Sequence, residues 1–146
     1  MHFSKNIYNV KLRQIDDADT NYIQELNTYG EIEFDTKRGK YYIISNDNGD
    51  MMGVIGYIKA NEKNTGFLQI LIDPSYRGRG LFKFAVDELL KQENLKRLYS
   101  TISIYNEPSI NAHLKYGFKF LDDDTIEKLR QHYFLSDTKT RMVYEV

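Results

Sequence analysis

Several short segments of this 146-residue chain alternate apolar with polar residues, which is the pattern of a half-buried strand. These segments are residues 8–12, 97–105 and 138–146, the last with Met142, Tyr144 and Val146 on one face. Two β-branched and aromatic runs, 41–45 and 51–60, flank an Asn-Gly turn and predict a hairpin. Residues 67–73 are almost continuously apolar, which predicts a central strand covered on both faces.

Helical spacing, with apolar residues three and four positions apart, predicts most of the remaining elements. The segments are residues 17–29 after Asp16, residues 81–93, residues 108–116 and a short acidic helix within 121–135. Gly30 and Gly117 follow two of these segments and suit helix ends. No repeat or linker interrupts this order, so we expect residues 1–146 to form a single domain.

Composition and charge exclude several classes of protein. Lys and Arg number 20 and Asp and Glu 21, so the net charge of −1 provides no general attraction to nucleic acid or anionic lipid. The absence of cysteine excludes disulfides and thiolate chemistry and fits a reducing cytoplasm, and the three histidines show no metal-ligand spacing. No run of about 18 apolar residues indicates export or membrane spanning. We therefore expect a cytoplasmic protein with no metal, no nucleic-acid partner and no membrane partner.

The loop before residues 81–93 contains Arg77, Gly78, Arg79 and Gly80 in succession. The first turn of a helix leaves backbone N–H groups unpaired and carries partial positive charge, and glycine lets an anion approach closely. Six Lys and Arg residues outnumber three Asp and Glu residues between positions 76 and 97. This loop predicts a phosphate-binding site, and a tight turn with solvated arginines is the alternative.

Two common nucleotide-binding motifs do not account for this loop. The Walker sequence G-x-x-x-x-G-K-[ST] is absent. A dinucleotide-binding fingerprint requires glycine or alanine where Lys83 stands. It also requires an acid about 20 residues further on, where Tyr99 and Ser100 stand. Both motifs are therefore set aside.

A second pattern follows downstream, made by Asn106, Ser109, Ala112, His113, Lys115, Gly117 and Phe118. It resembles the signature N-x-x-A-x-x-L-Y-x-K-x-G-F of the GCN5-related N-acetyltransferase (GNAT) family. The run RGRGLF at 77–82, after Ile72, Asp73 and Pro74, resembles that family's R/Q-x-x-G-x-G/A signature. The resemblance covers residues 66–121. It implies an α+β domain with the acyl-CoA N-acyltransferase (GNAT) fold, a mixed central sheet of six to seven strands flanked by helices.

The resemblance also implies acetyl-CoA as the acetyl donor, with a cleft where two parallel strands splay apart. Its pyrophosphate is expected on the backbone N–H groups of Arg77, Gly78, Arg79, Gly80, Leu81 and Phe82. Its pantetheine arm is expected beside Leu71, Ile72 and Asn106, with the Leu71 N–H holding the oxyanion. The implied reaction is direct attack on the thioester by a primary amine, without an acyl-enzyme.

Three residues depart from the family pattern. Phe82 replaces the last glycine or alanine, so its ring must turn toward the core to leave room for the coenzyme. Ser109 replaces a small apolar residue. His113 replaces a tyrosine near the sulfur and, with an ordinary pKa of about 6.5, is the expected proton donor for the leaving thiolate. A polar residue on a helix face is the alternative interpretation of His113.

The acceptor has no recognisable motif, and a small-molecule or peptide amine is expected. Glu31, Glu33 and Asp35 lie in the loop at 30–40 and could attract a cationic amine, although a solvated charged loop would look the same. Asp73 suits a loop cap better than a general base. A homodimer is an open option. Two alternatives stay open: a non-catalytic acetyl-CoA-binding module, and a phosphate-binding domain with a different ligand.

Overall fold

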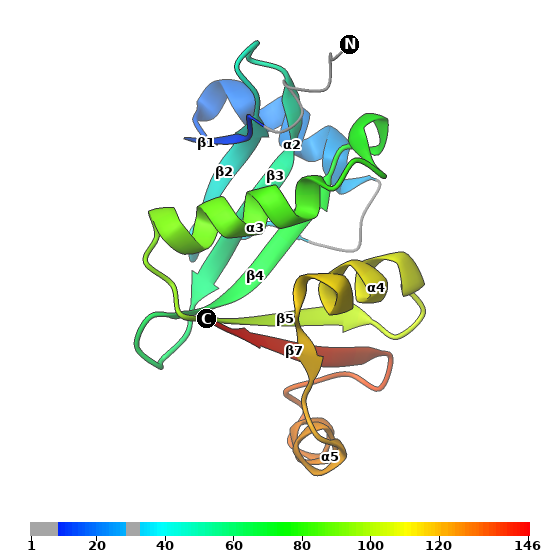
Figure 1. The fold of residues 1–146 in the computed structure, drawn as a ribbon. Helices are drawn as coiled ribbons and strands as arrows, with labels where there is room; N and C mark the ends of the chain where they lie inside the picture. The colour runs from blue at the N-terminus through cyan, green and yellow to red at the C-terminus, as the bar shows by residue number, and fades with distance from the viewer. Residues whose placement is uncertain (1–8, 29–32) are drawn as a thin grey trace.

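The computed structural model describes residues 9–28 and 33–146, whose strands form one seven-stranded sheet (Figure 1). In sheet order the strands are β1 (Lys11–Gln14), β2 (Gly39–Ser45), β3 (Met51–Lys59), β4 (Thr65–Ile72), β5 (Arg97–Ser103), β7 (Lys139–Glu145) and β6 (Lys119–Phe120). Neighbouring strands pair antiparallel, except β4 and β5, which run parallel. The predicted mixed sheet is confirmed, and so is the hairpin, which is formed by β2 and β3.

Helices connect the strands, and some of them begin at a side chain that caps the first turn. Within the described ranges the helices are α2 (Thr20–Asn27), α3 (Leu81–Gln92), α4 (Glu107–Tyr116) and α5 (Asp123–Gln131), with single 3-10 turns η1 (Asp17–Asp19) and η2 (Pro74–Tyr76). The carboxylates of Asp16 and Asp122 accept backbone N–H groups at the starts of η1 and α5. In this part of the chain, no helix has both the length and the apolar character needed to cross a lipid bilayer.

The ends of the chain differ from the predicted pattern. The first described strand begins at Lys11. The predicted strand start at residue 8 and the predicted helix end at Gly30 both lie outside the described residues. Val146 does not share the environment of Met142, because it follows β7 and is 69% exposed, whereas Met142 is fully buried. Alternation predicts the faces of a strand but not where the covering layer ends.

Alternation along the strands sorts the apolar side chains into two cores. Tyr42 and Leu68 pack in the core that contains α3, whereas Tyr41 and Leu71 pack with Leu26 of α2. Side chains of α4 also join the first core, so α3 and α4 cover one face of the sheet and α2 the other (Figure 1). We call these the front face and the back face. Neighbouring residues of β4 therefore contribute to opposite sides of the molecule.

A buried histidine joins α4 to β5 on the front face. His113 is 2% exposed, with Nδ1 2.7 Å from the carbonyl oxygen of Ser109 and Nε2 2.8 Å from Oγ of Ser100. A carbonyl oxygen can only accept, so Nδ1 donates to Ser109 and Nε2 accepts from the Ser100 hydroxyl. Both bonds suit a neutral ring, and burial lowers the pKa of His113.

We expect the wild-type protein to lose stability relative to His113→Gln as the pH falls below about 6.5. The unfolded chain takes up a proton at His113 that the folded protein resists, so acid favours unfolding by at most about 1.4 kcal/mol per pH unit. Urea unfolding of both proteins at several pH values measures this difference. His132→Gln, which alters an exposed histidine, is the control. Its free energy of unfolding should change with pH by the same slope as that of the wild type. Equal slopes for wild type and His113→Gln would contradict the prediction.

Candidate active site

β4 and β5 stop pairing after three positions, and a cavity opens between them. The paired positions are Thr65 with Arg97, Gly66 with Leu98 and Phe67 with Tyr99. Residues of both strands beyond this point line a cavity of about 1130 Å³. Backbone groups at an unpaired strand edge need another polar partner when water is excluded. The predicted splay of two parallel strands is confirmed, and it leaves the edge of β4 open to a ligand.

The register with β3 determines which backbone groups of β4 reach this open edge. Asp73 N–H donates to the carbonyl oxygen of Met52 across the β3–β4 pair. Bonded pairs recur at every second residue of an antiparallel ladder, so the N–H and C=O groups of Leu71 also face β3. Those of Ile70 and Ile72 face the cavity. The pairing therefore favours Ile70 or Ile72, rather than the predicted Leu71, as a backbone donor to a ligand.

The loop that follows β4 presents backbone N–H groups to open space. Gly78 and Gly80 have φ angles of +78° and +75°, in the left-handed region that glycine adopts without strain. A Cβ atom at either position would meet no atom within 4 Å. Within the part of the chain that the structure describes, no acceptor takes the N–H groups of residues 78–82. The N–H of Arg77, which was also predicted to bind the pyrophosphate, instead donates to the carbonyl oxygen of Pro74 at 3.4 Å. The start of α3 is therefore a site at which an anion can accept several hydrogen bonds.

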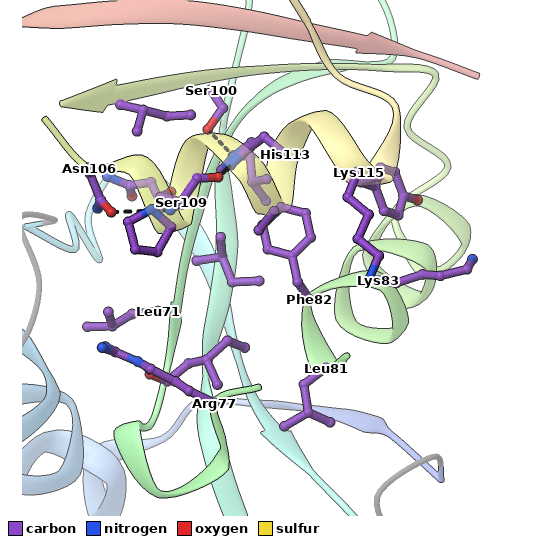
Figure 2. A pocket seen from close by; sticks show the side chains of 18 of the residues that line it. Leu71, Arg77, Leu81, Phe82, Lys83, Ser100, Asn106, Ser109, His113 and Lys115 are labelled. Atoms are coloured by element: carbon purple, nitrogen blue, oxygen red, sulfur yellow. Dashed lines mark hydrogen bonds between the residues drawn. The ribbon is translucent and has the colours of Figure 1, made fainter. Parts of the chain in front are cut away.

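Side chains near this loop leave its N–H groups uncovered. Arg77 Nε donates to the carbonyl oxygen of Ile72 at 3.1 Å, and the Arg79 guanidinium lies 5.4 Å from the centre of the Tyr76 ring. The Phe82 ring packs edge-on against His113 at 4.8 Å between ring centres (Figure 2). It turns toward α4 and the front core rather than over the loop, which confirms the expected orientation.

Helix α4 forms the opposite wall of the cavity. Asn106 Oδ1 accepts the N–H of Ser109 at 3.2 Å, and Asn106, Ser109 and His113 all line the cavity (Figure 2). Both nitrogens of His113 are engaged within the protein, so the ring must release Ser100 or Ser109 before it can protonate a ligand there. The donor role of His113 stays a prediction.

The cavity also reaches the back face of the sheet, where it is lined by side chains that no sequence motif singled out. Phe67, Gln69 and Thr101 occupy positions of the back face and line the cavity. Gln69 Nε2 donates to the carbonyl oxygen of Glu33 at 3.2 Å, and its Oε1 accepts from the Tyr41 hydroxyl. Strand alternation could have grouped these side chains on one face, but not shown that the sheet opens beside them.

The acids named as candidates for amine binding have different environments. Glu31 lies outside the described residues, and Glu33 lines the cavity. Asp35 pairs with Arg38 at 2.7 Å, and this hydrogen bond lowers the pKa of Asp35. Asp73 accepts the N–H of Ser75 and the hydroxyl of Tyr22, as a cap for η2. Over the described ranges, no three His, Cys, Asp or Glu residues lie close enough to hold a metal ion.

One protein family matches this sequence, and solved structures share its fold. No curated protein matches the chain. Among solved structures, mutant forms of the spermidine/spermine N-acetyltransferase SpeG from Vibrio cholerae superpose with a TM-score of 0.73 at 16% identity, covering 94% of both chains. The V. cholerae spermidine N-acetyltransferase in complex with CoA and spermine gives 0.71 at 16% identity, covering 94% of this chain and 95% of that one. At these identities the similarity shows the fold alone. The model of the acetyltransferase (GNAT) family matches residues 9–118, and the chain therefore belongs to that family.

Proposed function

We propose that this GNAT acetyltransferase moves an acetyl group from acetyl-CoA to a primary amine of a small molecule or peptide by direct attack. The observation that carries the proposal is the cavity between β4 and β5, which has uncovered N–H groups at one end and an unpaired strand edge along its length. We further propose that residues 1–146 form one GNAT domain that acts in the cytoplasm.

The residues present fit acetyl-CoA. The N–H groups of residues 78–82 suit a diphosphate, because a helix start carries partial positive charge and the glycines leave space there. Arg77 and Arg79 lie alongside with positive side chains. The edge of β4, near Leu71 and Ile72, can pair with the amide groups of a pantetheine arm, and Asn106 faces it from α4.

When bound, acetyl-CoA supplies a thioester: the acceptor nitrogen bonds to its carbonyl carbon, the C–S bond breaks, CoA leaves as a thiolate, and the nitrogen loses a proton. The chain contributes the surroundings of that exchange. A backbone N–H of Ile70 or Ile72 at the open edge holds the negative charge that develops on the carbonyl oxygen. His113, on the facing wall, is proposed to return a proton to the thiolate: once its bond with Ser100 opens, Nε2 can take up the proton that the nitrogen loses and pass it to the sulfur.

Arg77→Ala should weaken acetyl-CoA binding by about 1–2 kcal/mol, because a charged contact with phosphate is lost. Isothermal titration measures the change. Arg97→Ala is the matched control, since Arg97 lies where β4 and β5 are still paired and forms ion pairs with Glu62 and Glu145. Its affinity for acetyl-CoA should equal that of the wild type. If the wild-type protein binds no acetyl-CoA at about 100 μM, the proposed function is wrong.

His113→Ala should lower kcat about 10- to 100-fold and leave acetyl-CoA affinity nearly unchanged, because a proton donor acts on the leaving group and not on binding. Thiol release with a panel of amines gives kcat across the pH range. Ser100→Ala is the companion variant: it frees Nε2 but keeps the imidazole, so it should retain most of the activity. An unchanged rate for His113→Ala at every pH, or an equal loss in both variants, would remove His113 as the donor.

A further inference from the structure

Arg141 lies next to the cavity and has no carboxylate partner among the residues that the structure describes. Arg141 lies opposite Thr101 in the β5–β7 pair, and its Nε donates to Thr101 Oγ1 at 3.2 Å. Its guanidinium lies over the Phe67 ring, 5.2 Å from the ring centre. Thr101 and Phe67 both line the cavity. Arg141 is therefore held against two residues of the cavity wall.

The charge of Arg141 is not balanced within the described ranges. Arg13, Arg38 and Arg97 each form an ion pair with an Asp or Glu, whereas no carboxylate of the described residues lies within 4 Å of Arg141. Neither Nη atom of Arg141 donates to an acceptor there. The side chain is partly buried, and this burial lowers its pKa, although a guanidinium stays charged. A desolvated cation is stabilised when an anion joins it.

The position of Arg141 relative to the sheet places it on the acceptor side. The loop at 78–82 and helix α4, which are proposed to hold the coenzyme, belong to the front face. Phe67, Thr101 and Arg141 share the back face, by their register across β4, β5 and β7. With the coenzyme placed at the front as proposed, the opening from the back is the route left for an amine to reach the thioester. Its path passes Phe67 and Thr101, beside Arg141.

We propose that Arg141 binds the carboxylate of the acceptor, and that the substrates are amines that carry a carboxylate, such as amino acids or peptides. This rests on the proposed acetyltransferase function and adds the class of acceptor to it. The two Nη groups, which donate to no acceptor among the described residues, can donate to one carboxylate in a planar, two-bond arrangement. Glu33 lines the same cavity next to Gln69 of β4, away from β7, and can face the ammonium end. A polyamine such as spermidine would bring its further positive charges toward Arg141 and should be a poor acceptor.

The experiment compares acceptors that differ only in the carboxylate. Thiol release from acetyl-CoA is measured with amino acids and dipeptides, each beside its carboxamide, and with spermidine. We expect each carboxylate form to be acetylated with a KM about 10- to 100-fold lower than its amide. In Arg141→Gln, the KM for the carboxylate form should rise to that of the amide, while the KM for acetyl-CoA stays unchanged. Arg141→Lys keeps the charge but not the two-bond geometry. Its KM for the carboxylate form should lie between those of the wild type and Arg141→Gln.

Arg97→Gln is the matched control, an arginine of the same sheet face whose partners are carboxylates of the chain, and it should behave as the wild type. If spermidine or the amides have the same KM as the carboxylate forms, and Arg141→Gln changes no KM, the assignment of Arg141 is wrong. The proposed function survives that result. If phosphoethanolamine is the preferred acceptor, the anionic group that Arg141 binds is a phosphate, and the assignment to a carboxylate is wrong. If acetyl-CoA binds but no amine releases thiol, the proposed function fails as well.

Discussion

The separation of two parallel strands is the constraint on which the rest of this molecule depends. Up to Phe67 and Tyr99, β4 and β5 satisfy one another's backbone groups, and beyond them they do not. An unpaired edge inside a protein is costly unless a ligand or another polar group pairs with it. The gap therefore suits the coenzyme that we propose binds here, because a molecule with amide groups along its length can act as a temporary neighbouring strand.

Aromatic side chains pack together on the front face, beside the gap between the two strands. Phe82 of α3 packs edge-on against His113 of α4, and His113 packs in turn against Phe118. The hydrogen bond between His113 and Ser100 fixes this aromatic group to β5. A phenylalanine at position 82 is thus compatible with an open loop, because its ring belongs to the contact between the two helices. The same residues that depart from the family pattern hold the cleft walls in place.

The sequence was sufficient for the order of the elements and for the loop at 77–82, because periodicity and glycine-rich turns are local properties. It failed where the answer depends on a partner strand. Whether Leu71 or its neighbours direct an N–H toward the cavity is decided by the register with β3, which no pattern within β4 records. Arg141 was one charged residue in an alternating strand, and Ser100 belonged to no motif. Their importance follows only from the contacts with Phe67 and His113.

Successive side chains of β4 point to opposite faces of the sheet. Leu68, Ile70 and Ile72 point into the front core beside α3, whereas Phe67 and Gln69 point to the back. On the path that we propose for the amine, replacing a residue of the second set alters what the amine meets and leaves the packing of the front core unchanged. New acceptor preferences can therefore arise by single substitutions at every other codon of this segment, while use of the same acetyl donor is inherited unchanged.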